Sequence, residues 1–386
     1  MGPVVSTAFR VEVYDKFFAR KGLIGDPISV TITPKHMAPG VATVAVAANH
    51  RMVPVLLQKG ARIWLKDFST RQHLMSGWVS TFRISGPEKR AVVEFDIMDD
   101  FVILQRILGW VVPTAAITGQ GTAGTNWTMT DDAETVLKTA VDLNGVDRLG
   151  LPIDIPTSLG RGATVKARLR FQTLYDRLIP IEDGAGIIDS GIGVGVQQNP
   201  DAPGLRLNVW EPRVITQELN ENSGVVKSWG VNGRSATISR GVAGGQGEAQ
   251  LRLFREKADA ALETALGWKF EAFRDARDTD DPTTMYERID ETLKEGAAVS
   301  GMNVELSETA NFVARPGKIW VGDTVSMKLA GQVITDRLQE VTLSSTASEG
   351  KVTRPRIGTW SDNPDVKLAK IVQRIARGLR IANSDT

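Results

Sequence analysis

The first hundred residues alternate apolar and polar side chains with a period of two, and this pattern limits the fold more than any other feature. Successive side chains of a β-strand point to opposite faces, so the alternation predicts strands that each bury one face. The alternating apolar positions are Val11, Val13, Ile28, Val30, Ile32, Val44 and Val46. Strands are predicted at residues 11–16, 27–35, 42–48, 61–68, 73–85 and 90–100. Strands this short, separated by glycine and proline, favour an antiparallel barrel or sandwich.

Helical spacing interrupts the strands at four places before residue 183. Residues 53–60 predict a single helical turn, and residues 99–110 have helical spacing. Residues 130–145 predict a helix with Thr130 as its N-cap and Gly145 just past its end. The apolar spacing of residues 163–182 predicts another helix.

The later chain returns to strands and closes with two helices. Glycine-punctuated strands are predicted between residues 184 and 247, and two further β segments at 302–313 and 318–346, the second with three strands. Pro282 opens a predicted helix that ends near Gly296. A last helix begins with Asn363 as its N-cap.

These patterns together predict a β-rich α+β fold with an inserted middle region. We expect a β-barrel domain at 1–105, a helical and α+β insertion at 106–247, a second barrel domain with a helix at 248–350, and an amphipathic helix at 351–386. A chain of 386 residues is long enough for two to four such units.

Composition excludes several classes of site. The chain has no cysteine, so disulfides, thiolate nucleophiles and cysteine-bound zinc are impossible, and its 3 histidines all lie before residue 74. Its 46 basic and 45 acidic side chains argue against a protein that coats nucleic acid or lipid. No signal peptide is visible, and Pro113 and several glycines make the uncharged stretch 107–130 a loop rather than a membrane span.

An acidic cluster is the most enzyme-like feature of the chain. Clustered carboxylates can act as acid and base or bind a hard cation. The spacing lacks the central glycine and the closing glutamate of a calcium-binding loop. Aspartates also cap helices and stabilise turns, which is the interpretation we favour here. The cluster consists of Asp275, Asp278, Asp280 and Asp281.

No other motif indicates catalysis or a cofactor. His36, His50 and His73 occur in turns or at a strand start, outside any recognised motif with a nucleophile. The glycine-rich runs 191–196 and 241–247 lack the lysine and serine or threonine of a phosphate-binding loop. We therefore expect no catalytic residue, no cofactor and no metal.

The last predicted helix carries its basic side chains on one flank, opposite an apolar stripe. Such a helix either docks a partner or packs on its own domain with a solvated basic face, and the sequence leaves both readings open. The candidate docking residues are Lys367, Lys370, Arg374, Arg377 and Arg380.

Five segments in a fixed order carry a family resemblance that covers nearly the whole chain. They are VEVYDK to ARIWL (11–65), SGWVSTFRISG (76–86), EFDIMDD to WVVP (94–113), GWKFEAFRDARDTDDP (267–282) and VGDTVSMKLAGQVITDRLQEVTL (321–343). Taken together and in this order along the chain, the segments resemble the Gp37-like minor tail proteins of siphophages that infect actinobacteria. That family is related to baseplate hub and tail-associated proteins.

The resemblance implies a structural role at the tail tip of the virion. It implies a homotrimeric ring in which each subunit contributes two barrels that resemble the tail-tube protein and continue the tube. The implied partners are the distal tail protein, the tail tube, the tape measure protein and other minor tail proteins, with DNA passing transiently. Membrane anchoring and enzymatic activity are not implied.

An alternative of a different class stays open. A tail-tip cell-wall hydrolase or saccharide-binding protein would use Asp278, Asp280 and Asp281 as its acids. Larger members of the family carry lytic or fibre domains in a C-terminal extension, and the sequence ends at residue 386 without one. We therefore expect the structural role rather than hydrolysis.

Overall fold

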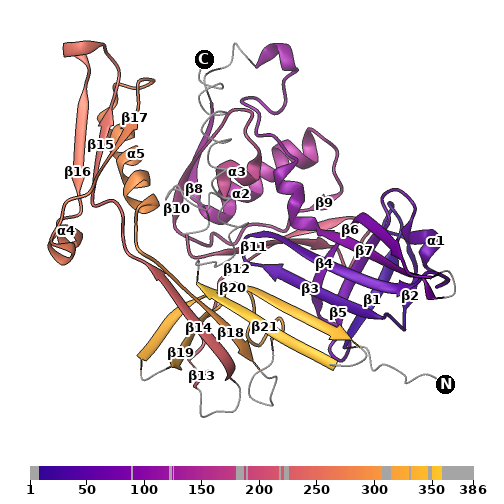
Figure 1. Cartoon of the computed structure of the whole chain (residues 1–386). Helices are drawn as coiled ribbons and strands as arrows, with labels where there is room; N and C mark the ends of the chain where they lie inside the picture. Colours follow the sequence, from indigo (N-terminus) through magenta and orange to yellow (C-terminus); the bar gives the residue numbers. More distant parts are fainter. Residues whose placement is uncertain are drawn as a thin grey trace. The chain divides into compact units, whose positions relative to one another are not determined.

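The computed structural model divides into two units (Figure 1). Unit 1 comprises residues 1–179, 190–230 and 303–358, and unit 2 comprises 180–189, 231–302 and 359–386. The structure describes residues 8–87, 90–120, 124, 126–179, 187, 190–216, 219–220, 226–306, 314–329, 332–346 and 350–358. Among these residues no helix is long and apolar enough to cross a bilayer.

A large sheet dominates unit 1 and confirms the β-rich α+β class. Its main path runs β14-β18-β21-β20-β3-β4-β7-β6-β5-β1-β2, and β19 links β20 to β13. The first seven strands are β1 (Phe9–Tyr14), β2 (Arg20–Ile24), β3 (Ser29–Lys35), β4 (Ala38–Ala47), β5 (Arg62–Asp67), β6 (His73–Ser85) and β7 (Val92–Asp99). The others are β13 (Leu219–Asn220), β14 (Val226–Arg234), β18 (Val299–Leu306), β19 (Thr324–Leu329), β20 (Gln332–Thr346) and β21 (Gly350–Gly358).

The period-two pattern correctly predicted the N-terminal strands. Val11, Val13, Ile32, Val44 and Val46 are fully buried, because their shared face forms the core. The predicted turn at 53–60 is α1 (Val53–Leu56). β2 escaped prediction because its residues Arg20-Lys21-Gly22 show no apolar alternation. The helical spacing at 99–110 is a 3₁₀ helix, η2 (Asp100–Gln105), with Asp99 accepting a hydrogen bond from the Phe101 amide.

Strands from the two ends of the chain pair directly in this sheet. Leu343 of β20 lies opposite Ile32 of β3, and the Thr33 and Thr342 hydroxyls are 3.2 Å apart. Two corrections arise here. The predicted three strands of 318–346 are two, β19 and β20, because Gly322 adopts φ +94° in a turn before β19. Residues 351–358, predicted as the start of the C-terminal helical segment 351–386, instead lie in β21, which pairs with β20. Among the described strands no pairing closes this sheet into a barrel.

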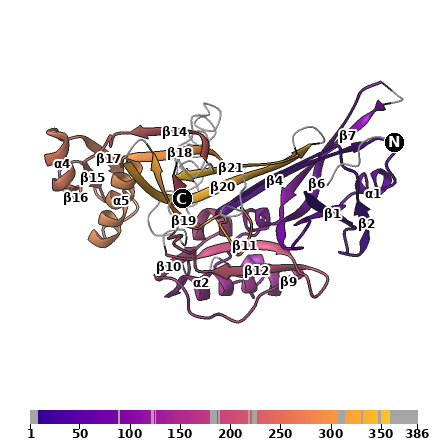
Figure 2. The same cartoon turned by 90° about the horizontal axis from the view of Figure 1, so that it is seen from below.

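The middle region of unit 1 forms smaller layers beside the large sheet (Figure 2). Its helices are α2 (Ala133–Val141), α3 (Leu174–Leu178), the π-helical η4 (Asp142–Asp147) and the 3₁₀ helix η3 (Ile117–Gly119). The predicted helix at 130–145 exists, but it begins after Asp132, whose carboxylate accepts a hydrogen bond from the Thr135 amide. Its strands form two sheets, β10-β8 and β11-β12-β9, from β8 (Trp127–Asp132), β9 (Ile153–Asp154), β10 (Thr164–Leu169), β11 (Gly193–Gln198) and β12 (Leu205–Trp210).

The helix predicted at 163–182 is wrong over its first half. Residues 164–169 form β10, which pairs antiparallel with β8, and only α3 is helical. Ala167 and Leu169 are the buried positions, so the strand period of two governs this segment. Phe171 then adopts φ +62°, which separates the strand from the helix.

Unit 2 contains a three-stranded sheet with a helix on one face. The order is β16-β15-β17, from β15 (Arg240–Gly244), β16 (Phe254–Ala258) and β17 (Glu271–Asp275), with a 3₁₀ turn η7 (Ala249–Leu251) before β16. α4 (Ala260–Leu266) joins β16 to β17, and α5 (Pro282–Glu295) packs through Met285 and Ile289 against Ala243. The predicted start at Pro282 and end at Gly296 of this helix are confirmed.

Candidate assembly interface

Three of the four aspartates in the acidic cluster, Asp275, Asp278 and Asp281, are engaged in local structure. Asp281 caps α5 by accepting hydrogen bonds from the Thr283 and Thr284 amides at 3.1 and 3.0 Å. Asp278 forms a bidentate ion pair with Arg288, which lowers the pKa of this carboxyl. Asp275 pairs with Arg252. Among the described residues no group of three acidic or histidine side chains could hold a metal ion. These contacts match the turn and capping roles that we favoured.

Calcium is expected to leave the melting temperature of the protein unchanged. The carboxylates that a cation would need already bind Arg288, Arg252 and the α5 backbone amides. Thermal unfolding followed with and without millimolar calcium, after treatment with a chelator, checks this expectation. A calcium-dependent rise of several degrees would show that the cluster binds the ion.

The histidines have separate structural environments. Burial, and next the charge of Arg337, lower the pKa of His36 to about 3. Burial, and next Lys66, lower the pKa of His73 to about 3, and its Nδ1 accepts a hydrogen bond from Trp64 Nε1 at 2.9 Å. His50 Nε2 lies 3.2 Å from Asp26. None of these contacts joins a histidine to a nucleophile, so they support the fold rather than catalysis.

The glycine-rich runs lie largely in strands, as the glycine-punctuated pattern predicted for residues 184–247. Residues 193–196 lie in β11, and 241–244 lie in β15. Gly193 permits close packing of Trp210, because a Cβ there would lie 2.4 Å from the indole. Their glycines therefore serve packing.

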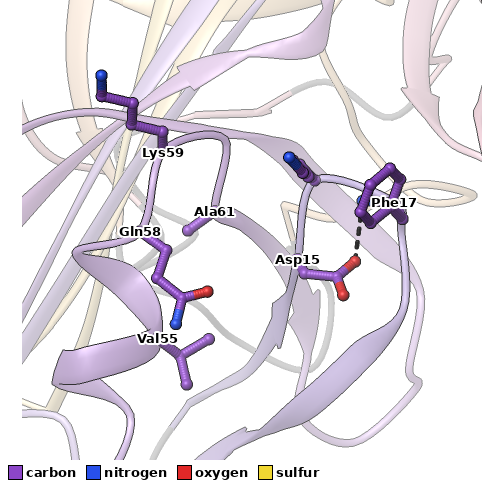
Figure 3. Close-up of a pocket in the computed structure, with 7 residues that line it drawn as sticks. Asp15, Phe17, Val55, Gln58, Lys59 and Ala61 are labelled. Atoms are coloured by element: carbon purple, nitrogen blue, oxygen red, sulfur yellow. Dashed lines mark hydrogen bonds between the residues drawn. The ribbon is translucent and has the colours of Figure 1, made fainter.

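A cavity of about 320 Å³ lies between the β1–β2 turn and α1 (Figure 3). Val55, Gln58 and Lys59 line one side, and Asp15 and Phe17 line the other. The Asp15 carboxylate accepts hydrogen bonds from the Phe17 and Ala19 amides, each at 2.9 Å, and pairs with Lys21. The carboxylate of Asp15 is thus engaged by the turn. The cavity lining holds one carboxylate, whereas glycoside hydrolysis commonly uses a pair.

A buried polar network joins the large sheet to the middle region of unit 1. Asp100 is fully buried, and Arg62 Nη2 lies 2.6 Å from each of its carboxylate oxygens. The Ser76 hydroxyl donates to Asp100 at 2.6 Å and accepts from the Gln198 amide of β11 at 2.7 Å. The network therefore fixes β11 against β6. The sequence contains no sign of this network, because its members are distant in the chain: Ser76 and Gln198 are 122 residues apart.

A second network fixes the start of α2. Glu134 is fully buried, and its carboxylate accepts hydrogen bonds from Arg161 Nε and Nη2, each at 2.8 Å. Lys138 donates to the same carboxylate at 2.6 Å. The Arg161 hydrogen bonds dominate over burial and lower the pKa of Glu134 to about 2.

Replacement of Glu134 by glutamine is expected to flatten the acid limb of the stability profile. The carboxyl has a pKa of about 2 when folded and 4.5 as its ordinary value, so between these pH values the unfolded chain binds the additional proton. Its stabilisation is complete above pH 4.5 and disappears as pH falls toward 2. Urea midpoints measured from pH 7 to 2 should fall less steeply in Glu134→Gln. Parallel curves for the two proteins would contradict the assignment.

An uncovered sheet edge is the clearest candidate for an interface in unit 1. β6 pairs with β5 only as far as Trp78, and the Ala61 carbonyl accepts the last hydrogen bond from the Val79 amide. Beyond that point no described strand covers this edge, and all residues 80–85 are exposed. Figure 2 shows this end of the β6–β7 hairpin reaching past the neighbouring strands. An unpaired edge of this kind is a template for another chain.

The same end of β6 carries apolar side chains on the core face of the sheet. Phe82 lies opposite Phe95, with the ring centroids 6.5 Å apart, and Ile84 lies opposite Val93. Phe95 and Val93 are fully buried, whereas Phe82 is 50% and Ile84 57% exposed. The apolar core face thus continues onto the free edge, and we call residues 80–85 the β6 edge.

The candidate docking residues of the last predicted helix lie outside the described residues. Lys367, Lys370, Arg374, Arg377 and Arg380 all follow Gly358, where the described chain stops. Their role stays a prediction.

Comparison with known proteins identifies a family and a fold. A family model described as Siphovirus ReqiPepy6 Gp37-like protein matches residues 10–359. No curated protein sequence matches the chain. The 43 kDa tail protein of prophage MuSo2 from Shewanella oneidensis has a TM-score of 0.58 at 11% identity, over 90% of this chain and 98% of that chain. The tail protein from Neisseria meningitidis MC58 has a TM-score of 0.54 at 10% identity, over 92% of this chain and 97% of that chain. At these identities the likeness shows a shared fold.

Proposed function

The chain belongs to the family of Siphovirus ReqiPepy6 Gp37-like proteins, and on this premise we propose that it is a structural minor tail protein of a siphophage virion. The observation that carries the proposal is the family match over residues 10–359. The fold that the chain shares with two solved tail proteins over most of its length supports it. Non-enzymatic function fits the acidic side chains that already serve as caps and ion-pair partners.

The position we propose is the tail tip, where three copies form a ring that continues the tail tube. Two modules per chain, within 1–105 and 248–350, would present six similar surfaces to the tube, with 106–247 as the insertion and a terminal helix that begins after β21 ends at Gly358. The β6 edge supports a ring, because a closed ring pairs free strand edges and covers apolar side chains that a monomer exposes. As part of this proposal, each of the two modules closes into a β-barrel.

The partners follow from that position. They are the distal tail protein and tail tube on one side, other minor tail proteins on the other, and the tape measure protein within the tube. Phage DNA would pass transiently through the ring. The near balance of 46 basic and 45 acidic side chains suits a passage that does not retain phosphates.

The proposed ring is expected to have a mass of about 125 kDa, three times the chain mass of 41.9 kDa. Light scattering on the purified chain gives the solution mass, and cryo-microscopy of intact tails gives the symmetry at the tip. A 41.9 kDa species in solution together with tip density that lacks threefold symmetry would contradict the ring.

A further inference from the structure

The sheet of unit 2 is covered on one face and open on the other. Gly241 and Ala243 of β15 face α5, since a Cβ on Gly241 would lie 2.6 Å from Ile289 and Ala243 packs with Met285. Because side chains alternate along a strand, Val242 and Gly244 face the opposite side. Among the described helices, none packs buried side chains against that opposite face. The neighbouring helix α4 has no buried residue. Figure 1 shows α5 beside β15 and β17.

The open face carries two solvent-exposed aromatic rings. Phe254 of β16 and Phe273 of β17 are 51% and 56% exposed. Phe254 lies opposite Gly244, and Phe273 lies opposite Val242. The Arg252 guanidinium lies 5.6 Å from the Phe254 centroid and 5.4 Å from the Phe273 centroid, so it bridges the two rings. We call Val242, Phe254 and Phe273 the aromatic face. Two exposed phenylalanines on one sheet face call for a cover.

The C-terminal segment of this chain has the apolar stripe that such a cover needs. Residues 364–382 predict a helix of about five turns. At 100° per residue, one side of that helix collects the stripe Leu368, Ile371, Val372, Ile375 and Leu379. Lys370 and Arg377 fall on the opposite side, and Lys367 and Arg380 fall on the two flanks between that side and the stripe.

Charge favours the same pairing. Residues 231–302 of unit 2 contain thirteen acidic and ten basic side chains, whereas residues 364–382 contain five basic and one acidic side chain. Glu256, Glu271 and Asp275 lie on the open side of the sheet by the alternation of β16 and β17. Glu256 and Asp275 already pair with Arg240 and Arg252, and Glu271 adds a further carboxylate on this side. The excess of acidic side chains in unit 2 therefore attracts the basic segment.

We propose that the helix of residues 364–382 docks on the aromatic face of unit 2 and completes a helix–sheet–helix layer with α5. Its apolar stripe covers Phe254 and Phe273, and its strongly basic side faces outward. This inference concerns one chain and does not depend on the role of the protein in a tail.

The absence of cysteine makes the proposal directly testable by disulfide formation in the full chain. Phe273→Cys is combined with Ile375→Cys or Val372→Cys on the stripe, and with Lys370→Cys or Arg377→Cys on the opposite side as matched controls. A disulfide needs its Cα atoms within about 4.4–6.8 Å, so only stripe positions can reach the sheet. We expect oxidation at least about tenfold faster for a stripe pair than for both controls.

Two outcomes of this experiment would overturn the proposal. One is equal oxidation rates for stripe and control pairs. The other is disulfides that join isotopically light and heavy chains after mixing, because these would show a second copy on the aromatic face. Mass spectrometry of the linked peptides distinguishes links within a chain from links between chains.

A second measurement does not require a cysteine. Ile375→Asp with Leu379→Asp places charges on the stripe, and the amides of β15, β16 and β17 are then expected to exchange hydrogen faster, at least about threefold. The matched control, Lys370→Gln with Arg377→Gln, lowers the net charge by the same two units without touching the stripe, and unit 1 amides serve as an internal reference. Unchanged exchange in the stripe variant, or equal acceleration in the control, would contradict the docking.

Discussion

Replacement of Asp100 by alanine is expected to lower the free energy of unfolding by about 3–5 kcal/mol, because it leaves the Arg62 charge buried without a partner. Arg62 is only 7% exposed, and its Nη2 has both Asp100 oxygens as close partners. The Ser76 hydroxyl also loses its acceptor, which loosens its link to the Gln198 amide. Urea denaturation followed by circular dichroism measures the change.

The matched control is Asp275→Ala, which removes the partner of Arg252 from an exposed pair. The Asp275 side chain is 58% exposed, so its loss should change stability by less than about 1 kcal/mol. A further variant, Arg62→Met with Asp100→Leu, removes both charges and should recover part of the loss. Equal effects of Asp100→Ala and Asp275→Ala would show that the buried network does not hold the middle region in place.

Aspartates at Phe82 and Ile84 are expected to dissociate the proposed ring into single chains. Both side chains lie on the β6 edge at half exposure, where a partner could bury them. Buried apolar anchors at an interface each contribute about 2 kcal/mol or more, and a charge on a free strand edge prevents edge pairing. Light scattering should show the mass falling from about 125 kDa toward the chain mass of 41.9 kDa.

The control for this variant carries aspartates at Ile117 and Leu159, which are 62% and 73% exposed in the middle region of unit 1. It introduces the same number of charges at apolar surface positions away from the β6 edge, and the ring should persist. Thermal unfolding of both variants separates dissociation from misfolding. A ring that survives Phe82→Asp with Ile84→Asp in a folded protein would exclude the β6 edge as the interface.

Structural demands account for the polar groups that looked chemically useful. Asp278 and Asp281 stabilise the start of α5, the histidines are held neutral by burial or lie in turns, and Asp15 organises the β1–β2 turn. Exposed apolar side chains that share one face with a buried core or with each other occur at the β6 edge in unit 1 and on the aromatic face in unit 2. Apolar surface of this kind is suited to assembly.

The sequence by itself determined the N-terminal strands, α2 and α5, because each depends on neighbours a few residues away. Period-two burial, a capping aspartate and a proline at the first helical position are local signals. The same locality explains the error at 163–182, where β10 depends on its pairing with β8 more than thirty residues earlier. Propensity within the segment cannot report that partner.

Tertiary structure alone decided which strands share a sheet and which polar groups meet. The pairing of β20 with β3 joins residues about three hundred positions apart, and the contact of Arg62 with Asp100 and Ser76 with Gln198 arises only when three elements pack. The exposure of Phe82 depends on where β5 stops beside β6, and that of Phe273 on which face of its sheet is covered by α5. Local sequence sets the periodicity of each helix or strand. Which face of that element becomes buried depends on the elements that pack against it, and a local sequence pattern does not identify those elements.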